Sequence, residues 1–308
     1  MRAVRFHAYG GPDVLRVEEV QAPAIGPDDV LLDVDAAGVN PLDWKIRSGA
    51  LAQLMPLPLP FILGWDVAGT IASVGENVRG FMPGNAVFGM IPIGATGAYA
   101  EKAVIPASAL ASKPQALAPN EAAAIPVVGL AAYQLVRGQT PVEPGQTVLV
   151  LGAAGNVGRL CVALAQHDGA QVIAAGKKAD LDRVDWPSEV TLLAVDKAPP
   201  SRGALAIDVL IDTVGGEVLE TAITFVRPGG RLVSTVQPPD VSRAQEITGE
   251  MLQVVSDAAA LKELGDLFVA GTLPIPRVTP FDMPAVARAH AIGEAEHAGK
   301  LVLSMRAT

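Results

Sequence analysis

Apolar residues in about the first 120 positions recur in short alternating runs that glycine and proline keep interrupting. Runs of this length, separated by turn residues, are typical of strands in a sheet that curls towards a barrel. The pattern therefore predicts a partly open β-barrel for this part of the chain. The expected strands are residues 3–6, 14–18, 30–37, 67–74, 86–90 and 98–105.

From about residue 125 to 270 the pattern changes, and apolar strands alternate with segments of helical periodicity. Such alternation is typical of a parallel sheet covered by helices, so we expect a doubly wound α/β lobe. A last apolar strand, Lys300–Leu303, is expected to return to the first lobe. The predicted strands of the α/β lobe are 147–151, 171–175, 191–195, 207–212, 231–235 and 251–255, with a helix from Ser256 to Gly271 after the last.

A glycine-spaced turn follows the strand 147–151 and precedes a helix expected to begin near Asn156. Gly155 and Gly158 keep the spacing of a dinucleotide-binding G-x-G-x-x-G turn, with Ala153 in place of its first glycine. Such a turn lets the backbone approach a pyrophosphate, and the helix N-terminus offers N–H donors to the anion. A plain strand-to-helix connector is the alternative, but the strand that follows completes a βαβ unit and favours the dinucleotide. The candidate cofactor residues here are Gly152, Ala153, Ala154, Gly155, Asn156, Val157 and Gly158.

The residues after the strand 171–175 bear on the choice between NAD and NADP. A carboxylate at this place binds the ribose 2′-hydroxyl of NAD and would repel a 2′-phosphate. The chain has Gly176, Lys177 and Lys178 there instead. The glycine leaves room and the lysines can neutralise a phosphate, so NADP(H) is the predicted cofactor and Lys177 the preferred contact. The alternative is that both lysines are solvated at the start of a surface helix.

Composition and charge narrow the classes of protein that remain. Half of the 308 residues are apolar and the formal net charge is −9, which favours a large core and argues against nucleic acid or an anionic membrane as partner. Prolines and glycines break the two long uncharged stretches, 48–65 and 122–136, so neither is expected to span a membrane. The single cysteine, Cys161, is expected to be a buried, inert thiol. No apolar signal core follows Met1, so a cytoplasmic location is expected.

Motifs spread over nearly the whole chain make a family resemblance specific. The chain resembles a zinc-independent medium-chain dehydrogenase/reductase of the quinone oxidoreductase (zeta-crystallin-like) group. The resemblance implies a GroES-like substrate and catalytic domain at 1–122 and 272–308, a Rossmann NADP-binding domain at 123–271, and NADPH held between them. It also implies a small hydrophobic, electrophilic substrate and a homodimer joined through the edge of the Rossmann sheet. Besides the glycine turn, the motifs are Gly10-Gly-Pro-Asp-Val-Leu15, Gly38-Val-Asn-Pro-Leu-Asp43, Arg47-Ser-Gly49, Gly64-Trp-Asp-Val-Ala-Gly69, Gly97-Ala-Tyr-Ala-Glu101, Gly129-Leu-Ala-Ala-Tyr133, Asp212-Thr-Val-Gly-Gly216 and Gly299-Lys-Leu-Val-Leu303.

The same resemblance separates this chain from the zinc alcohol dehydrogenases of that superfamily. Those enzymes carry a cysteine where Asn40 stands and a His-Glu pair where Trp65 and Asp66 stand. Without thiolate and imidazole no tetrahedral catalytic zinc is expected, and nothing would stabilise an alkoxide as the metal does. Hydride transfer from NADPH to a quinone or to the β-carbon of an α,β-unsaturated carbonyl fits better. His290 and His297 are interpreted as surface residues of a helix, not as metal ligands.

Four side chains are carried over from the family as catalytic candidates. Asn40 would donate a hydrogen bond to the nicotinamide amide or the substrate carbonyl, or else serve as a turn residue before Pro41. Asp43 would face the same end of the cofactor, or be the N-cap residue of a helix. Lys45 would polarise a carbonyl or stay solvated, and Tyr133 would lie near the nicotinamide or be a core aromatic. Backbone around the nicotinamide is expected from the strand-end residues Val214, Gly215 and Val236.

One departure from the family keeps two functional classes open. Many relatives place a tyrosine shortly after Arg47-Ser-Gly49, at a position similar to the proton donor of enoyl reductases, and this chain has none before Met55. The first class is a reductase of quinones or activated alkenes, with an enoyl-thioester reductase as its nearest variant. The second is a catalytically weak NADPH-binding protein with a structural or regulatory role. The apolar stretch 51–63, together with Trp65, is expected to form the wall of a pocket for a hydrophobic acceptor.

Overall fold

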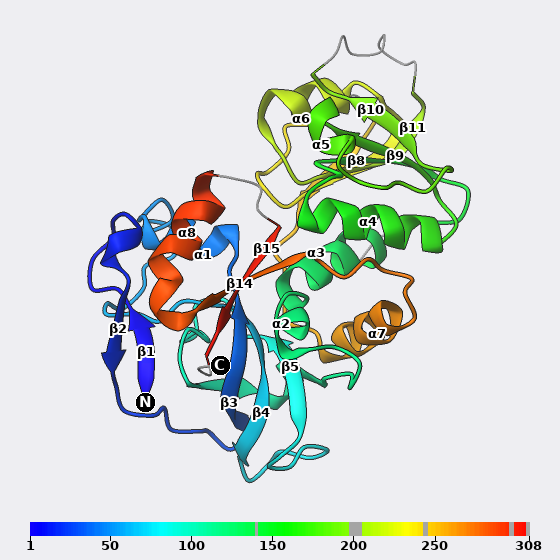
Figure 1. The fold of residues 1–308 in the computed structure, drawn as a ribbon. Helices are drawn as coiled ribbons and strands as arrows, with labels where there is room; N and C mark the ends of the chain where they lie inside the picture. The colour runs from blue at the N-terminus through cyan, green and yellow to red at the C-terminus, as the bar shows by residue number, and fades with distance from the viewer. Residues whose placement is uncertain (139–140, 197–204, 243–245, 296–298, 306–308) are drawn as a thin grey trace. The chain divides into compact units, whose positions relative to one another are not determined.

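The computed structural model describes residues 1–308 except 139–140, 197–204, 243–245, 296–298 and 306–308 (Figure 1). Contacts within the chain divide it into two compact units. The first comprises Met1–Leu130, Val255–Val269 and Ile275–Thr308, and the second comprises Ala131–Val254 and Ala270–Pro274. The domain limits expected from the sequence, after residues 122 and 271, remain a prediction.

Among the described residues, an open sheet of seven strands forms the centre of the first unit. Its order is β14, β15, β3, β4, β5, β7, and β6 pairs with β3 as well. Only the β14–β15 pair is parallel, and this part of the chain shows no closure into a barrel, in agreement with the predicted open form. A separate antiparallel pair, β1 (Arg2–Arg5) and β2 (Arg16–Glu19), accompanies the sheet. The strands are β3 (Asp29–Gly38), β4 (Asp66–Val74), β5 (Ala86–Met90), β6 (Lys102–Pro106), β7 (Leu110–Ser112), β14 (Val278–Asp282) and β15 (Lys300–Ser304).

The burial pattern of β3 shows how the sequence produces this sheet. Alternate residues from Val30 to Ala36 are buried, and burying each valine or leucine side chain stabilises the fold by about 1.5–3 kcal/mol. Towards its carboxyl end β3 becomes buried on both faces. There Gly38 pairs with Asp66 of β4, and an added Cβ on Gly38 would clash with the Asp66 carboxylate and the Ala123 carbonyl. The glycine thus leaves the space that the Asp66 side chain occupies.

Helices cover the sheets of the first unit. They are α1 (Pro41–Arg47), α2 (Pro119–Ala122), the start of α3 (Pro126–Arg137), α7 (Ala258–Val269) and α8 (Val286–Ala295), with 3₁₀ turns η1 (Pro12–Val14), η2 (Ala107–Ala109) and η3 (Met283–Ala285). α7 contacts β7, and it buries the predicted stripe of Leu261, Leu264 and Phe268. α1 contacts α8, where the Trp44 ring meets the His290 ring edge-on at 6.4 Å.

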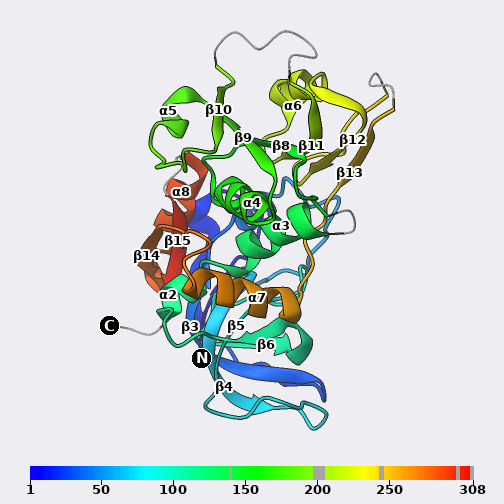
Figure 2. The ribbon, with the colours of Figure 1, turned by 90° about the vertical axis from the view of Figure 1, so that its right-hand side faces the viewer.

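The second unit contains a parallel sheet in the order β10, β9, β8, β11, β12, β13 (Figure 2). The strand order reverses at β8, because β9 and β10 follow on one side and β11 to β13 on the other. This is the doubly wound Rossmann order, as predicted. The elements are β8 (Thr147–Leu151), α4 (Asn156–His167), β9 (Gln171–Gly176), α5 (Lys178–Leu181), β10 (Thr191–Ala194), β11 (Ile207–Asp212), α6 (Gly216–Ile223), β12 (Val226–Ser234) and β13 (Thr248–Met251).

Three strand predictions need correction. The strand expected at 231–235 is β12, Val226–Ser234, which begins five residues earlier. The sixth strand of the Rossmann sheet is Thr248–Met251, not 251–255, and all four of its residues are exposed. An exposed edge strand carries no alternation of buried and polar residues, so the pattern gave no signal for it. In the first unit β6 begins at Lys102, whereas the expected strand began at residue 98.

Cys161 lies fully buried on α4, and burial raises the pKa of its thiol, as expected for an inert cysteine. Within the described residues, no helix combines the length and apolar character that crossing a bilayer requires.

Candidate functional site

The glycine turn between β8 and α4 has the geometry that its spacing predicts. Gly152 has a positive φ of +73°, which glycine adopts without strain. An added Cβ on Gly158 would clash with the Gly152 carbonyl, so α4 packs on the turn at a distance that only glycine permits. Ala153, buried, donates its N–H to the Ala175 carbonyl at 3.0 Å and ties the turn to the end of β9.

This turn is suited to an anionic group. Gly155 is the N-cap of α4 and has no side chain to cap the helix, whose first-turn N–H groups lack intrahelical acceptors. A Cβ added to Gly155 would meet only the Gly152 carbonyl, at 3.2 Å, so the space beside this residue is otherwise open. The residues present therefore fit a pyrophosphate. Ala154, Asn156 and Val157 line the same turn and are half-buried.

The two lysines after β9 differ in their surroundings. Gly176 ends β9, and both lysines are exposed. The Lys178 ammonium forms an ion pair with Asp182 at 2.8 Å, and the Lys178 N–H donates to Asp196 at 2.9 Å. Lys177 is the N-cap of α5, and within the described ranges its side chain makes no ion pair or hydrogen bond. Of the two lysines, Lys178 is thus the one whose charge is paired within the described residues.

Buried side chains hold the ends of β11 and β12 in place. The buried Asp212 carboxylate accepts the N–H groups of Val214 and Gly215, both at 2.9 Å, and the Ser234 hydroxyl at 2.6 Å. The Ser234 oxygen in turn accepts the Val236 N–H at 3.1 Å. The side chains of Val214 and Val236 are 46% and 38% exposed, so these loops present apolar groups at the sheet edge.

Strand register places the predicted cofactor residues along one edge of the sheet. Ser234 pairs with Asp212, Asp212 with Leu151, and Leu151 with Ala175. The glycine turn, the segment 176–178, and the loops at 214–215 and 236 each follow one of these residues. The structure therefore brings together the predicted cofactor residues, which come from four different strand ends.

In the first unit, Asn40 and Asp43 form the N-terminal cap of α1. Asn40 is the N-cap residue and its N–H donates to the Asp43 carboxylate at 2.8 Å. The other Asp43 oxygen accepts the Gly64 N–H at 2.9 Å. Burial raises the pKa of Asp43 to about 7, although both backbone hydrogen bonds and the Lys300 charge act in the opposite direction. Asp43 is thus not the N-cap of α1, which is Asn40, but its carboxylate caps the helix from the third helical position.

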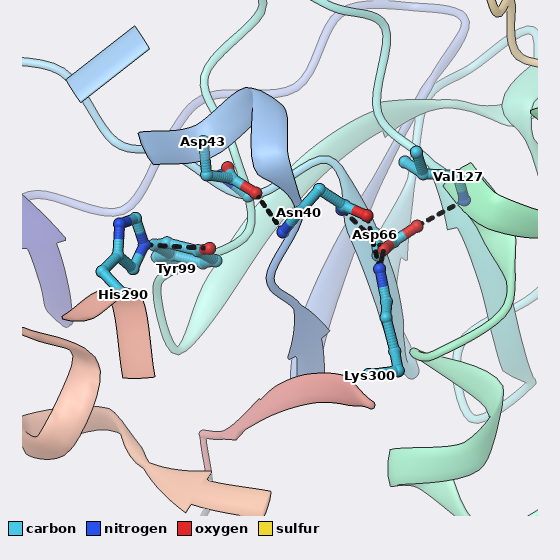
Figure 3. A network of polar contacts seen from close by, with 8 residues as sticks. Asn40, Asp43, Asp66, Tyr99, Val127, His290 and Lys300 are labelled. Carbon is cyan, nitrogen blue, oxygen red and sulfur yellow. Dashed lines mark hydrogen bonds and ion pairs between the residues drawn. The ribbon is translucent and has the colours of Figure 1, made fainter. Parts of the chain in front are cut away.

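A second carboxylate, Asp66, lies at the centre of a buried network (Figure 3). One Asp66 oxygen accepts the side-chain N–H of Asn40 at 2.8 Å and contacts the Lys300 ammonium at 2.6 Å. The other accepts the Val127 N–H in the first turn of α3 at 2.5 Å. Lys300 also donates to the Asn40 side-chain oxygen. Asn40, Asp66 and Lys300 are at most 2% exposed, so this ion pair is shielded from water.

Beside this network lies a buried histidine, which corrects the interpretation of His290 as a surface residue. His290 is fully buried, and its Nε2 lies 3.4 Å from the Tyr99 hydroxyl. Burial, and secondarily the Arg47 charge, lowers the pKa of His290 to about 3, so the ring is neutral. His297 lies outside the described residues. The pKa of Tyr99 is raised by burial and by the nearby Asp43 carboxylate.

The other catalytic candidates are more exposed. Lys45 lies on α1 and is exposed. Tyr133, on α3, is half-buried, and the Arg137 guanidinium lies 5.6 Å from the centre of its ring. In the predicted apolar wall, Phe61 and Trp65 are core residues, whereas Leu54 is 85% exposed. The wall as a whole therefore mixes core and surface positions.

Comparisons with known proteins agree with this description. Residues 26–115 match the family described as "Alcohol dehydrogenase GroES-like domain", and residues 192–303 match "Zinc-binding dehydrogenase". The chain is 32% identical, over 98% of its length and 79% of the relative, to the chloroplastic NADPH-dependent alkenal/one oxidoreductase of Arabidopsis thaliana.

Solved structures of quinone oxidoreductases are also similar to this chain. The quinone oxidoreductase from Coxiella burnetii has a TM-score of 0.88 with 28% identity, covering 99% of both chains. The Escherichia coli quinone oxidoreductase complexed with NADPH has a TM-score of 0.84 with 25% identity, covering 99% of this chain and all of that one.

Proposed function

Because the chain belongs to the quinone oxidoreductase group of the medium-chain dehydrogenase/reductase family, we propose that it uses NADPH to reduce a small hydrophobic quinone or α,β-unsaturated carbonyl. The observation that carries the proposal is the row of cofactor-type residues along the carboxyl edge of β9, β8, β11 and β12. Dinucleotides bind at this edge of doubly wound sheets.

The residues at this edge would bind different parts of the cofactor. The turn 152–158 would hold the pyrophosphate through backbone N–H groups and the N-terminus of α4. Lys177 would meet the 2′-phosphate, and Gly176 would leave room for it. Val214, Gly215 and Val236, held by Asp212 and Ser234, would surround the nicotinamide ribose and carboxamide.

For the reaction itself, NADPH supplies the hydride when it is bound. The chain's own residues would orient the acceptor and stabilise the negative charge that develops on its carbonyl oxygen. The Asn40 amide is the preferred donor to that oxygen, because its hydrogen bonds to Asp66 and Lys300 fix its orientation. A quinone is already electrophilic, so its reduction needs little acid catalysis, and the final proton can come from water.

Lys177 and Lys178 offer a matched pair of variants that test the choice of NADP. We expect Lys177→Ala to raise the KM for NADPH by about tenfold while leaving the KM for NADH unchanged, because only NADPH carries the 2′-phosphate. Lys178→Ala is the control, since Lys178 is paired with Asp182. Steady-state kinetics with an ortho-quinone measure both. If Lys177→Ala raised the KM for NADH as much as the KM for NADPH, or if Lys178→Ala raised the KM for NADPH as much as Lys177→Ala does, the assignment of Lys177 to the 2′-phosphate would be contradicted.

We further propose that the protein acts in the cytoplasm as a homodimer joined at β13. Within the described residues β13 pairs on one side only, with β12, and Met251 is 42% exposed. An open strand edge can add a second strand, here β13 of another copy. Light scattering should give twice the 31.7 kDa of one chain. Gly249→Pro or Glu250→Pro should reduce the measured mass to that of one chain. A wild-type protein with the mass of one chain would refute the proposal.

A further inference from the structure

The Lys300 ammonium and the Asp66 carboxylate form an ion pair that is almost completely buried. Lys300 is the first residue of β15, Asp66 the first of β4, and Asn40 follows β3. Replacing a buried ion pair by apolar residues of similar volume is often neutral or stabilising, so such a pair is weak evidence for a role in stability. Both charges act on the same third group, the side chain of Asn40.

The two charges determine which way the Asn40 amide faces. An ammonium group only donates hydrogen bonds and a carboxylate only accepts them. Lys300 must therefore meet the Asn40 oxygen, and Asp66 must meet the Asn40 nitrogen, as the structure has them. A flipped amide would set N–H against ammonium and oxygen against carboxylate. The orientation of this amide is thus fixed by charge as well as by packing.

The same contacts leave one donor of Asn40 available. The amide nitrogen carries two hydrogens, and among the described residues one is donated, to Asp66. The Lys300 charge on the amide oxygen withdraws electron density from the nitrogen and strengthens the remaining N–H as a donor, because linked hydrogen bonds polarise one another.

We propose that Lys300 and Asp66 are positioning residues that orient and polarise the Asn40 amide, so that its second N–H donates to the carbonyl oxygen of the acceptor. This inference rests on the proposed reductase function. Neither Lys300 nor Asp66 touches the acceptor. Asp66 has a further contact, the Val127 N–H, so Lys300 is the more selective residue to substitute.

The orientation of the amide can be measured without any activity. The chain has five asparagines, so ¹⁵N-asparagine labelling gives a simple spectrum, in which Asn40→Ser identifies the Asn40 side-chain signals. We expect the wild-type pair of amide protons to be widely separated and slow to exchange with solvent. In Lys300→Met the separation should collapse and exchange should become faster. Unchanged Asn40 signals in a folded Lys300→Met protein would overturn the positioning role.

Kinetics test the consequence for the reaction. We expect Lys300→Met to lower kcat about tenfold, to leave the KM for NADPH within twofold, and to add nothing when Asn40 is already alanine. Independent effects that multiply in the double variant would overturn the proposal. Loss of the NMR signature without any loss of kcat would do the same. A wild-type protein that fails to reduce any quinone or enone refutes the proposed function instead, and the NMR result then still decides the orientation.

Two further variants separate positioning from stability. Where Lys300→Met does not fold, the double variant Asp66→Asn with Lys300→Met avoids an unpaired buried charge and should show the same loss of kcat. Ile105→Ala is the control for stability. Ile105 is a fully buried core residue of β6, paired with Val30 at the far end of β3. We expect a lower Tm and an unchanged kcat, and a comparable loss of kcat in this variant would argue against positioning.

Discussion

At the scale of single residues, Asp43 shows how burial and hydrogen bonding compete. Both of its oxygens accept backbone N–H groups, which favours the ionised form, yet burial prevails and raises its pKa to about 7. The sequence left open whether Asp43 acts in catalysis or caps a helix. The structure shows the capping contacts, which the spacing of Asn40 and Asp43 around the start of α1 could have indicated.

The raised pKa of Asp43 predicts a pH dependence of stability. The folded carboxyl keeps its proton up to about pH 7, whereas the unfolded one loses it near pH 4. The protonated Asp43 side chain therefore makes its full contribution to the free energy of unfolding below about pH 4, and this contribution is lost as the pH rises to 7. The slope is at most about 1.4 kcal/mol per pH unit. Urea unfolding at several pH values should show this decline in the wild type and not in Asp43→Asn, and equal slopes would contradict it.

At the scale of elements, two glycines of the turn between β8 and α4 are expected to have different roles, Gly158 in packing and Gly155 in ligand binding. Gly158→Ala forces a Cβ against the backbone of the turn, and we expect a clear loss in Tm. In Gly155→Ala the added Cβ meets only the Gly152 carbonyl, at 3.2 Å, so the loss in Tm should be smaller than in Gly158→Ala. The same methyl group would occupy space needed by the pyrophosphate, and the Kd for NADPH should rise by about tenfold or more. Thermal melts and NADPH titrations measure these effects, and unchanged NADPH binding by Gly155→Ala would contradict the pyrophosphate site.

Ser234 joins the ends of β11 and β12 through one hydroxyl. Ser234→Ala removes its bonds to Asp212 and Val236 and should lower the free energy of unfolding by about 1–3 kcal/mol. Because the loops at 214–215 and 236 are expected to face the nicotinamide, the KM for NADPH should also rise. Thr224→Ala is the control, since its hydroxyl bond to Thr221 lies in an exposed turn. Loss of stability with no change in KM would assign Ser234 to the fold alone.

The elements also show what the hydrophobic pattern can predict. The strands β8, β9 and β11 are predicted to within one residue, because buried parallel strands are continuous apolar runs. The edge strand β13 is missed because its exposed residues carry no such signal. His290 is missed because a buried neutral histidine on an amphipathic helix has the same spacing as an exposed one.

At the scale of the whole molecule, the family resemblance and the long-range contacts contribute different information. The motifs identify Asn40, Asp66 and Lys300 one by one, but Lys300 stands 260 positions from Asn40 and 234 from Asp66. Their meeting follows from the pairing of β15 and β4 with β3, which no local pattern encodes. By contrast, the cofactor residues follow from the strand ends of one repeating βα pattern, so the sequence alone placed them at one edge.

The oxidation of NADPH by the purified protein in the presence of a soluble ortho-quinone shows most directly whether the whole chain is an NADPH-dependent reductase. An α,β-unsaturated ketone serves as second acceptor, and NADH serves as the cofactor control. We predict turnover with NADPH, much weaker turnover with NADH, and a loss of this preference in Lys177→Ala. Tight binding of NADPH with no turnover on either acceptor would contradict the reductase function and identify a binding protein instead.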